Sequence, residues 1–272
     1  MQIIPIQLDS SSKLLIRDMW IVEEANGINI QVKAFPTGYP YINVISGTAF
    51  SIKDHKGNTQ ETTAYISGNS RYPFELNMCV IKRALTIQLQ PYAIPYLIGI
   101  PADEFSEQRV PLKAFSKQMS DYLGELINSN LKSSKVLQNA SSFFKACADN
   151  LFVDIRVLKA LHEIIKHRGN ISVRTINSQL NLSQRRLQQL FRYNLGMSAK
   201  SYTEIVKIQN HTFNLLKGQK LDYIVPDGYY DQSHFIHHLK KQTSMSPTVF
   251  QKFITSSEHH GAYYVSNLFY GI

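Results

Sequence analysis

The stretch 224–250, IVPDGYYDQSHFIHHLKKQTSMSPTVF, is an imperfect copy of an earlier stretch, 176–202, INSQLNLSQRRLQQLFRYNLGMSAKSY. The two align at a constant offset of 48 residues, which places Asp231 opposite Ser183. Self-similarity at a fixed offset indicates two copies of one supersecondary unit. The sequence therefore predicts a tandem helical arrangement in the C-terminal part of the chain.

The first copy has the pattern of two short helices joined by a sharp turn. Val173, Ile176 and Leu180 recur at the spacing of one helical face. Asn181 tolerates the left-handed backbone that a sharp turn requires, and Ser183 is a preferred helix N-cap. A helix, a short turn and a second helix form the unit that places its second helix in the major groove of DNA.

The second helix of each copy presents polar side chains on its outward face. Arg matches the edge of guanine and Gln that of adenine, whereas Lys is suited to phosphate. We expect Arg185 and Gln189 to discriminate bases, and Lys240 and Lys241 to hold phosphates. The alternative is that both are capped surface helices without a ligand. The presence of two units in register, both in the basic half, argues against this alternative. The predicted DNA-binding residues are Arg185, Arg186, Gln188, Gln189, Arg192, Gln232, Ser233, His237, Lys240 and Lys241.

Charge is unevenly distributed along the 272 residues. Residues 1–150 carry 14 Lys and Arg against 13 Asp and Glu, a net charge of +1. Residues 151–272 carry 15 against 7, a net charge of +8. A basic half joined to a near-neutral half favours a polyanionic partner for the basic half alone. A solubilising excess of charge is the other explanation.

Residues 154–253 resemble the tandem helix-turn-helix domain of AraC/XylS-type transcription regulators. The resemblance rests on GYYDQSHFIHHLKKQTSMSPTVF around the second recognition helix and LNLSQRRLQQLFRYNLGMSAKSY around the first. It implies two recognition helices that enter adjacent major-groove segments on one face of the DNA. It also implies a long helix over 199–217 that joins the two units. In that family, the residues matching Arg185, Gln189, Gln232, Ser233 and His237 contact bases.

The second unit departs from the family pattern in its first helix. The stretch from Leu221 to Asp231 is one residue short, and Pro226 stands where a helical N–H is expected. The resemblance therefore implies base reading more securely for the first unit than for the second.

The first hundred residues have the pattern of a β-rich domain. Short runs rich in Ile, Val, Tyr and Thr alternate with Gly, Pro and Asn turns. SGNSRYPFEL (67–76) and LTIQLQPYAIPYLIGIPADEFSEQRVPL (85–112) resemble the sensory domain of one AraC-type subgroup, a cupin-like β-barrel followed by helices. The predicted fold class is α+β: an N-terminal cupin-like barrel with helices and a C-terminal all-α tandem helix-turn-helix domain.

These patterns predict four regions. Residues 1–130 form a β-rich domain for effector binding or dimerisation, 131–150 a linker, 151–255 the DNA-binding domain, and 256–272 a C-terminal extension. The stretch 131–142 is the most linker-like, although it could continue as helix. Asp149 or Asn150 is expected to cap the first helix after the linker.

The sensory half offers weaker candidates for its partners. Trp20, Tyr39, Tyr41 and Phe50 are candidates for an effector pocket, although aromatic residues in a barrel commonly form its core. An amphipathic helix near 113–127 is the candidate for a homodimer contact, with packing inside the chain as the alternative.

An enzyme is the main alternative function, either a cupin-type metal enzyme or a DNA-repair protein fused to an AraC-type domain. A metal site needs clustered ligands, yet residues 1–150 contain only His55 as histidine. A repair methyltransferase needs a reactive cysteine, and Cys79 lies in a strand-like run. An RNA reader or a scaffold protein is a further alternative. We predict no enzymatic activity, no cofactor and no metal.

The chain has no apolar run near the roughly 20 residues that cross a bilayer, and its start lacks a signal-peptide pattern. Cys79 and Cys147 make no disulfide framework. These features predict a cytoplasmic protein without a membrane partner. Its expected partners are double-stranded promoter DNA, a small effector, a second copy of the chain, and RNA polymerase, since the family leans towards activation.

Overall fold

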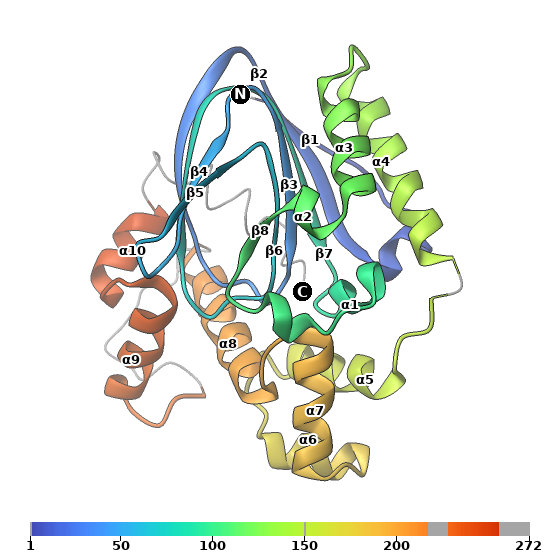
Figure 1. The fold of residues 1–272 in the computed structure, drawn as a ribbon. Coiled ribbons are helices and arrows are strands. Elements are labelled where there is room, and N and C mark those ends of the chain that lie inside the picture. The colour runs from blue at the N-terminus through green and yellow to red at the C-terminus, as the bar shows by residue number, and fades with distance from the viewer. Residues whose placement is uncertain (1, 150, 217–227, 256–272) are drawn as a thin grey trace.

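The computed structural model describes residues 2–149, 151–216 and 228–255 of the chain. An antiparallel sheet with covering helices makes up the N-terminal half, and the C-terminal half is helical (Figure 1). The predicted α+β class, with an N-terminal sheet domain and C-terminal helix-turn-helix units, is confirmed.

Within the described residues, one eight-stranded sheet contains all the strands, in the order β1-β2-β7-β3-β6-β8, with β4 paired to β7 and β5 to β4. The long strands β2 and β7 pair along most of their length and form its centre. Along its other side, β7 pairs first with β4 and later with β3. The strands are β1 (Gln2–Pro5), β2 (Ile16–Ala34), β3 (Tyr41–Ser46), β4 (Phe50–Lys53), β5 (Thr59–Thr62), β6 (Ala64–Ser67), β7 (Phe74–Leu89) and β8 (Arg109–Pro111).

Side chains alternate between the two faces of the sheet, as the pleat requires. Ile42 and Val44 of β3 pack into the main core, which α3 and α4 complete. Ile45 points to the opposite face, where it packs with Phe50 and Tyr65. We call this second side the inner face. The N-terminal helices are η1 (Ser12–Leu14), α1 (Ala93–Ile98), η2 (Ala102–Phe105), α2 (Leu112–Phe115), α3 (Lys117–Asn128) and α4 (Ser133–Ala148).

The predicted linker 131–150 differs in the structure, because most of it is α4. Val136, Ala140 and Phe144 are fully buried in the main core. The hydroxyl groups of Ser12 and Ser141 also lie 3.1 Å apart, within hydrogen-bond distance. This helix therefore belongs to the N-terminal half, while the predicted domain boundaries as such stay a prediction.

The helix near 113–127, the dimer candidate, is α2 followed by α3. Met119, Leu123 and Ile127 of α3 are buried in the main core of the same chain. Its apolar face is occupied within the chain, so the structure does not support dimerisation through that face.

The C-terminal half begins with a helix whose start differs from the prediction. Its N-cap is Asp154, whose side chain accepts from the backbone N–H of Arg156, rather than Asp149 or Asn150. The helices are α5 (Ile155–Lys166), α6 (Val173–Leu180), α7 (Gln184–Leu195), α8 (Ala199–Leu216), α9 (Gln232–Thr243) and α10 (Pro247–Thr255). Within the described ranges, no helix is long and apolar enough to cross a membrane.

Candidate nucleic-acid interface

The first helix-turn-helix unit consists of α6 and α7. Asn181 at the turn adopts the predicted left-handed conformation, with φ 51° and ψ 43°. Ser183 caps α7, because its side chain accepts from the backbone N–H of Arg186 at 3.2 Å. Both local predictions are confirmed. The N-terminal end of α7 is thereby fixed, and with it the direction in which its first polar residues point.

Burial divides α7 into two faces. Leu187, Leu190 and Phe191 lie in a core shared with α5, α6 and α8. Arg185 and Gln189 are exposed, one helical turn apart on the opposite face. The other predicted residues of this helix, Arg186, Gln188 and Arg192, are also exposed. The structure therefore presents the predicted side chains together on one accessible surface.

The second unit presents its recognition helix in the same way. Asp231 caps α9 by accepting from the backbone N–H of His234 at 2.7 Å, as predicted. Phe235 and Leu239 are buried against α8 and α10. Of the predicted residues, Gln232, Ser233, His237 and Lys240 are exposed, and Lys241 is partly buried. The first helix predicted for this unit falls on residues 217–227, outside the described residues, as does the extension 256–272.

Histidines cluster on α9, and one of them points into the protein. The rings of His234 and His238 are 4.5 Å apart. Burial, with a further contribution from the neighbouring His234 and His237, lowers the pKa of His238 to about 4. The ring is therefore neutral near pH 7, and its 3.6 Å approach to Glu204 of α8 is a contact between a neutral and a charged group rather than an ion pair.

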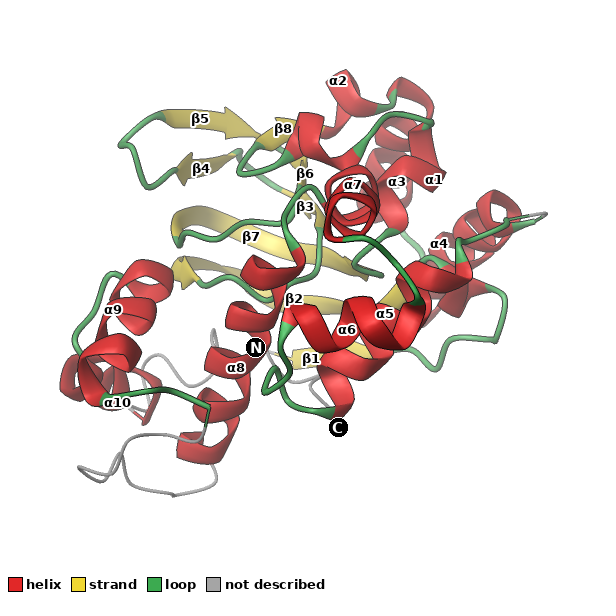
Figure 2. Cartoon of the chain, turned by 90° about the horizontal axis from the view of Figure 1, so that it is seen from below, coloured by secondary structure: helices red, strands yellow, loops and turns green. Residues whose placement is uncertain are grey.

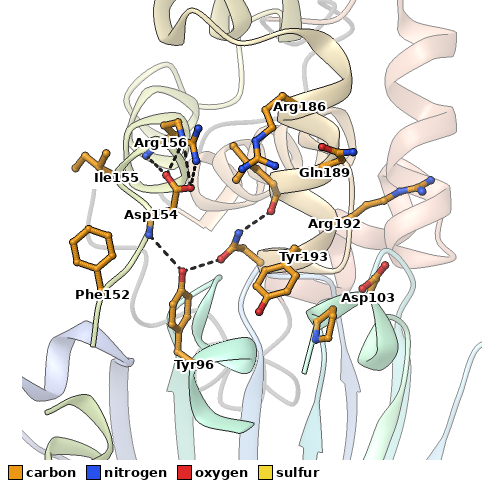
Figure 3. A pocket seen from close by; sticks show the side chains of 13 residues that line it. Tyr96, Asp103, Phe152, Asp154, Ile155, Arg156, Arg186, Gln189, Arg192 and Tyr193 are labelled. Atoms are coloured by element: carbon orange, nitrogen blue, oxygen red, sulfur yellow. Dashed lines mark hydrogen bonds and ion pairs between the residues drawn. The ribbon is translucent and has the colours of Figure 1, made fainter. Parts of the chain in front are cut away.

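A cleft of about 1080 Å³ runs along one flank of α7 (Figure 3). Arg186, Gln189 and Arg192 line one wall, whereas Asp103 and Tyr96 come from the N-terminal half. The entrance carries the exposed apolar side chains of Phe152, Ile155 and Tyr193. Sequence reasoning missed this second wall, because it is brought to α7 only by tertiary packing.

Hydrogen bonds hold the cleft together at its base. Tyr96 donates to Asn194 of α7 at 3.1 Å, and Asn194 in turn donates to the carbonyl of Leu190 at 2.9 Å. Asp154 pairs with Arg156 at 2.6 Å, and this hydrogen-bonded guanidinium lowers the pKa of the Asp154 carboxyl. Asp154 therefore remains ionised beside a wall that is otherwise basic.

The C-terminal end of α7 is fixed to the sheet domain. The side-chain amide of Asn69 donates to the carbonyls of Pro91 and Leu195, at 3.1 and 3.0 Å. Gly196 ends the helix with φ +71°, and a Cβ there would lie 2.6 Å from the carbonyl oxygen of Ala102. Figure 2 shows α7 next to α1, in line with these contacts. The first recognition helix is thus docked on the N-terminal half at a place where only glycine fits.

A loop of the sheet domain, Phe35–Tyr39, reaches the second unit as well. Phe35 packs edge-on against Phe250 of α10, with ring centroids 5.4 Å apart. The side chain of Gln209 donates to the carbonyl of Pro36, and Gly38 lies so close to the ring of Tyr202 that a Cβ there would be 2.9 Å from it. We call Phe35–Tyr39 the brace, because it contacts both α8 and α10.

The four predicted effector residues are largely buried. Trp20 and Phe50 are 1% and 2% exposed, and Phe50 packs on Tyr65. Tyr41 accepts a hydrogen bond from Gln88 at 2.7 Å. Tyr39 belongs to the brace, unlike Trp20, Tyr41 and Phe50. Their role in effector binding stays a prediction.

The residues relevant to the enzyme alternative are dispersed. The described residues contain no group of three or more His, Cys, Asp and Glu side chains arranged to hold a metal ion. The ring of His55 stacks on Tyr72, 4.2 Å away. Cys147 is half-buried, and burial raises the pKa of its thiol. The side chain of Cys79 lies outside the described residues.

Comparison with known proteins identifies the C-terminal part. Residues 176–252 match the family model of a helix-turn-helix domain. The predicted AraC-type domain is thereby confirmed for this part of the chain. No curated protein matches the chain.

Similar solved structures include two of ToxT from Vibrio cholerae strain SCE256. The apo form of a ToxT variant is 13% identical with a TM-score of 0.47, over 92% of this chain and 100% of that one. Wild-type ToxT bound to an unsaturated fatty acid is 12% identical with a TM-score of 0.47, over 89% and 95%. The AraC-like transcriptional activator CuxR is 15% identical with a TM-score of 0.29, over 74% and 80%.

Proposed function

We propose that this DNA-binding transcription regulator recognises a specific promoter site with α7 and α9, each inserted in the major groove, and that it activates transcription. The observation that carries the proposal is the exposed face of α7. There a capped helix presents Arg185 and Gln189 together, while the apolar side of the same helix is buried in the core. These are the side chains that match guanine and adenine edges.

Charge supports the same assignment. The net charge of +8 lies in residues 151–272, and the last turn of α9 carries two lysines, whose charges suit DNA phosphates. Arg185, Arg186, Gln188, Gln189 and Arg192 act in the first unit, and Gln232, Ser233, His237, Lys240 and Lys241 in the second.

The N-terminal half has the regulatory role in this proposal. It binds a small effector, and neither half is an enzyme. An activator also contacts RNA polymerase, and a second copy of the chain is a further partner. Residues 151–255 are the DNA-binding part and residues 1–130 the sensory part.

The test is a binding-site selection on the full chain, followed by salt titrations on the best site. We expect Arg185→Ala and Gln189→Ala to relax base preference at particular positions, at a cost of about 1–3 kcal/mol each. Lys240→Ala should weaken all sequences alike and lower the salt slope by about one unit. Lys117→Ala, an exposed lysine on α3, is the matched control and should change neither. Absence of any sequence preference in the folded wild-type chain would reject the proposal.

A further inference from the structure

We propose that Tyr230, the residue that immediately precedes the N-cap of α9, is a further specificity-determining residue, and that its ring packs on the methyl group of a thymine in the half-site read by α9. This inference rests on the proposed function, in which α9 enters the major groove. It adds an apolar contact to the second unit, whose predicted DNA-binding residues are all polar or charged.

Tyr230 is unusually exposed for an aromatic residue. Its side chain is 92% exposed, more than any other large hydrophobic residue in the described ranges. A single exposed apolar residue is common on protein surfaces, so the exposure gains its meaning from the position. Tyr230 stands two residues before Gln232, at the N-terminal end of a recognition helix, and this is the end whose residues contact base edges.

The corresponding position of the first unit has a different environment. At the offset of 48 residues, Tyr230 corresponds to Leu182. Leu182 is partly buried and packs on the core that contains Leu187, the fourth residue of α7. This matches a hydrophobic staple, in which the residue before the N-cap packs on the fourth residue of the helix. The first unit therefore uses this position for folding.

In the second unit, Tyr229 makes the packing contact instead. It is 9% exposed, and its ring centroid lies 5.2 Å from that of Phe235, the fourth residue of α9. The rings of His211 of α8 and of His238 lie 5.6 and 5.9 Å from it. Because Tyr229 fills the core at the start of α9, the outward ring of Tyr230 is not needed for folding.

The backbone that carries Tyr230 is held by neighbouring elements. Lys207 of α8 donates from Nζ to the carbonyl of Gly228 at 2.8 Å, and the same Nζ lies 5.5 Å from the centre of the Tyr229 ring. Gly228 has φ +85°, and a Cβ there would overlap with Oδ1 of Asn170, which lies between α5 and α6. This backbone is therefore fixed before DNA binds, which lowers the entropic cost of any contact that Tyr230 makes.

The thymine methyl is the group that such a ring matches in the major groove. Base edges there carry hydrogen-bond donors and acceptors, and the C5 methyl of thymine is their apolar group. Burial of one methyl against the ring is worth roughly a fourfold gain in affinity. A phosphate contact through the hydroxyl group would carry no base preference. The ring therefore predicts a thymine at one position of the α9 half-site.

The experiment is a binding-site selection with the full-length wild type, Arg185→Ala and Tyr230→Ala. The α9 half-site is the part whose base preferences survive Arg185→Ala. We expect one thymine preference there, and Tyr230→Ala should relax that position alone and weaken binding roughly 5–10-fold.

Replacement of thymine by deoxyuridine tests the contact directly, because it removes only the methyl group. Each thymine of the α9 half-site is replaced in turn, and the affinities are measured by anisotropy titration. One replacement should weaken binding by the wild type about fourfold and should not weaken binding by Tyr230→Ala. Arg185→Ala, which alters the other recognition helix, should keep the fourfold response.

Further variants separate the ring from the hydroxyl group and from folding. Tyr230→Phe keeps the ring, so its affinity should stay within about twofold of the wild type, with the same deoxyuridine response. Tyr230→Ala should leave Tm within about 2 °C of the wild type. The neighbouring Tyr229→Ala removes a buried ring and should lower Tm by about 5 °C or more. Leu131→Ala, an exposed apolar control between α3 and α4, should change neither Tm nor DNA binding.

Several results would overturn the inference. Tyr230 contacts no methyl group if the α9 half-site shows no thymine preference, or if Tyr230→Ala responds to deoxyuridine as the wild type does. If Tyr230→Phe loses as much affinity as Tyr230→Ala, the hydroxyl group makes the contact. The proposed function survives all three results, provided that Arg185→Ala changes the base preference. If the folded wild-type chain shows no sequence preference at all, the proposed function itself fails.

Discussion

The two helix-turn-helix units share a repeated sequence, yet they are held in different ways. In both, a polar N-cap starts the recognition helix and a residue in the left-handed conformation ends it: Gly196 in the first unit and Ser244 in the second. The first helix is docked on the sheet domain through Asn69 and Gly196, whereas the second is packed on α8 and α10. A local repeat therefore sets the local fold, and residues outside it decide the anchoring.

The units also differ in the charge that they present. The exposed face of α7 carries arginines, whose charge is constant over the whole working range of pH. The exposed and half-buried positions of α9 carry three histidines together with two lysines. The two recognition helices therefore present different side-chain chemistry, and burial together with the neighbouring histidines lowers the pKa of one α9 histidine, His238, to about 4.

The largest effect should come from the docking of the first unit. Gly196→Ser gives the αL position the residue that the second unit has, and we expect a loss of about 2–4 kcal/mol in the free energy of unfolding. The reason is that the new Cβ adds a 2.6 Å contact with Ala102 to the cost of a positive φ. Urea denaturation measures it. An effect below about 0.5 kcal/mol would mean that the first unit is not held at this point.

A smaller effect should separate the two recognition helices on DNA. Arg185→Ala should cost about 1–3 kcal/mol on the best site, and His237→Ala less, because one imidazole makes fewer hydrogen bonds to a base than a bidentate arginine. Competitive anisotropy titrations at one salt concentration measure both. Equal losses of binding free energy in the two variants would show that the two units contribute equally to DNA binding.

Acidification should weaken the second unit and spare the first. The folded pKa of His238, about 4, is below its ordinary value of 6.5, so the unfolded chain takes up the proton first. Stability is then full above about pH 6.5 and is lost as the pH falls towards 4, by about 1–3 kcal/mol. Urea denaturation at about pH 7.5 and about pH 4.5 measures this, and His238→Gln should remove this part of the pH dependence. An unchanged pH dependence in His238→Gln would contradict the assignment.

The smallest expected effect is a gain. Ser244→Gly relieves a positive φ of 58° at the end of α9, and should stabilise the chain by about 0.5–1 kcal/mol. Combined with Gly196→Ser, it exchanges the two C-caps between the units. If the double variant had the same free energy of unfolding as the wild type, the difference in anchoring between the two units would not lie at these caps.

Features governed by neighbours in sequence could be predicted, and features governed by distant contacts could not. Ser183, Asp231 and Asn181 each satisfy a backbone requirement within a few residues, and the structure has all three as predicted. The N-cap at Asp154 was missed, because several acidic or amide residues near it are equally good caps by sequence.

Most of the predicted linker is helical for a different reason. Residues 131–142 are rich in Ser, Lys and Asn, which favours a loop, but the buried apolar face of Val136, Ala140 and Phe144 outweighs that preference in α4. The wall of the cleft that comes from the N-terminal half had no signal in sequence at all.

The brace has a consequence for the DNA itself. Because Phe35–Tyr39 contacts both α8 and α10, the separation of α7 and α9 depends on the sheet domain as well as on the helix between them. On the proposed function, the two half-sites lie about 10–10.5 base pairs apart, and one inserted base pair turns one half-site by roughly 35° about the duplex axis. A pair of helices fixed from both sides cannot follow that rotation, so the spacing of the operator becomes a determinant of recognition in its own right.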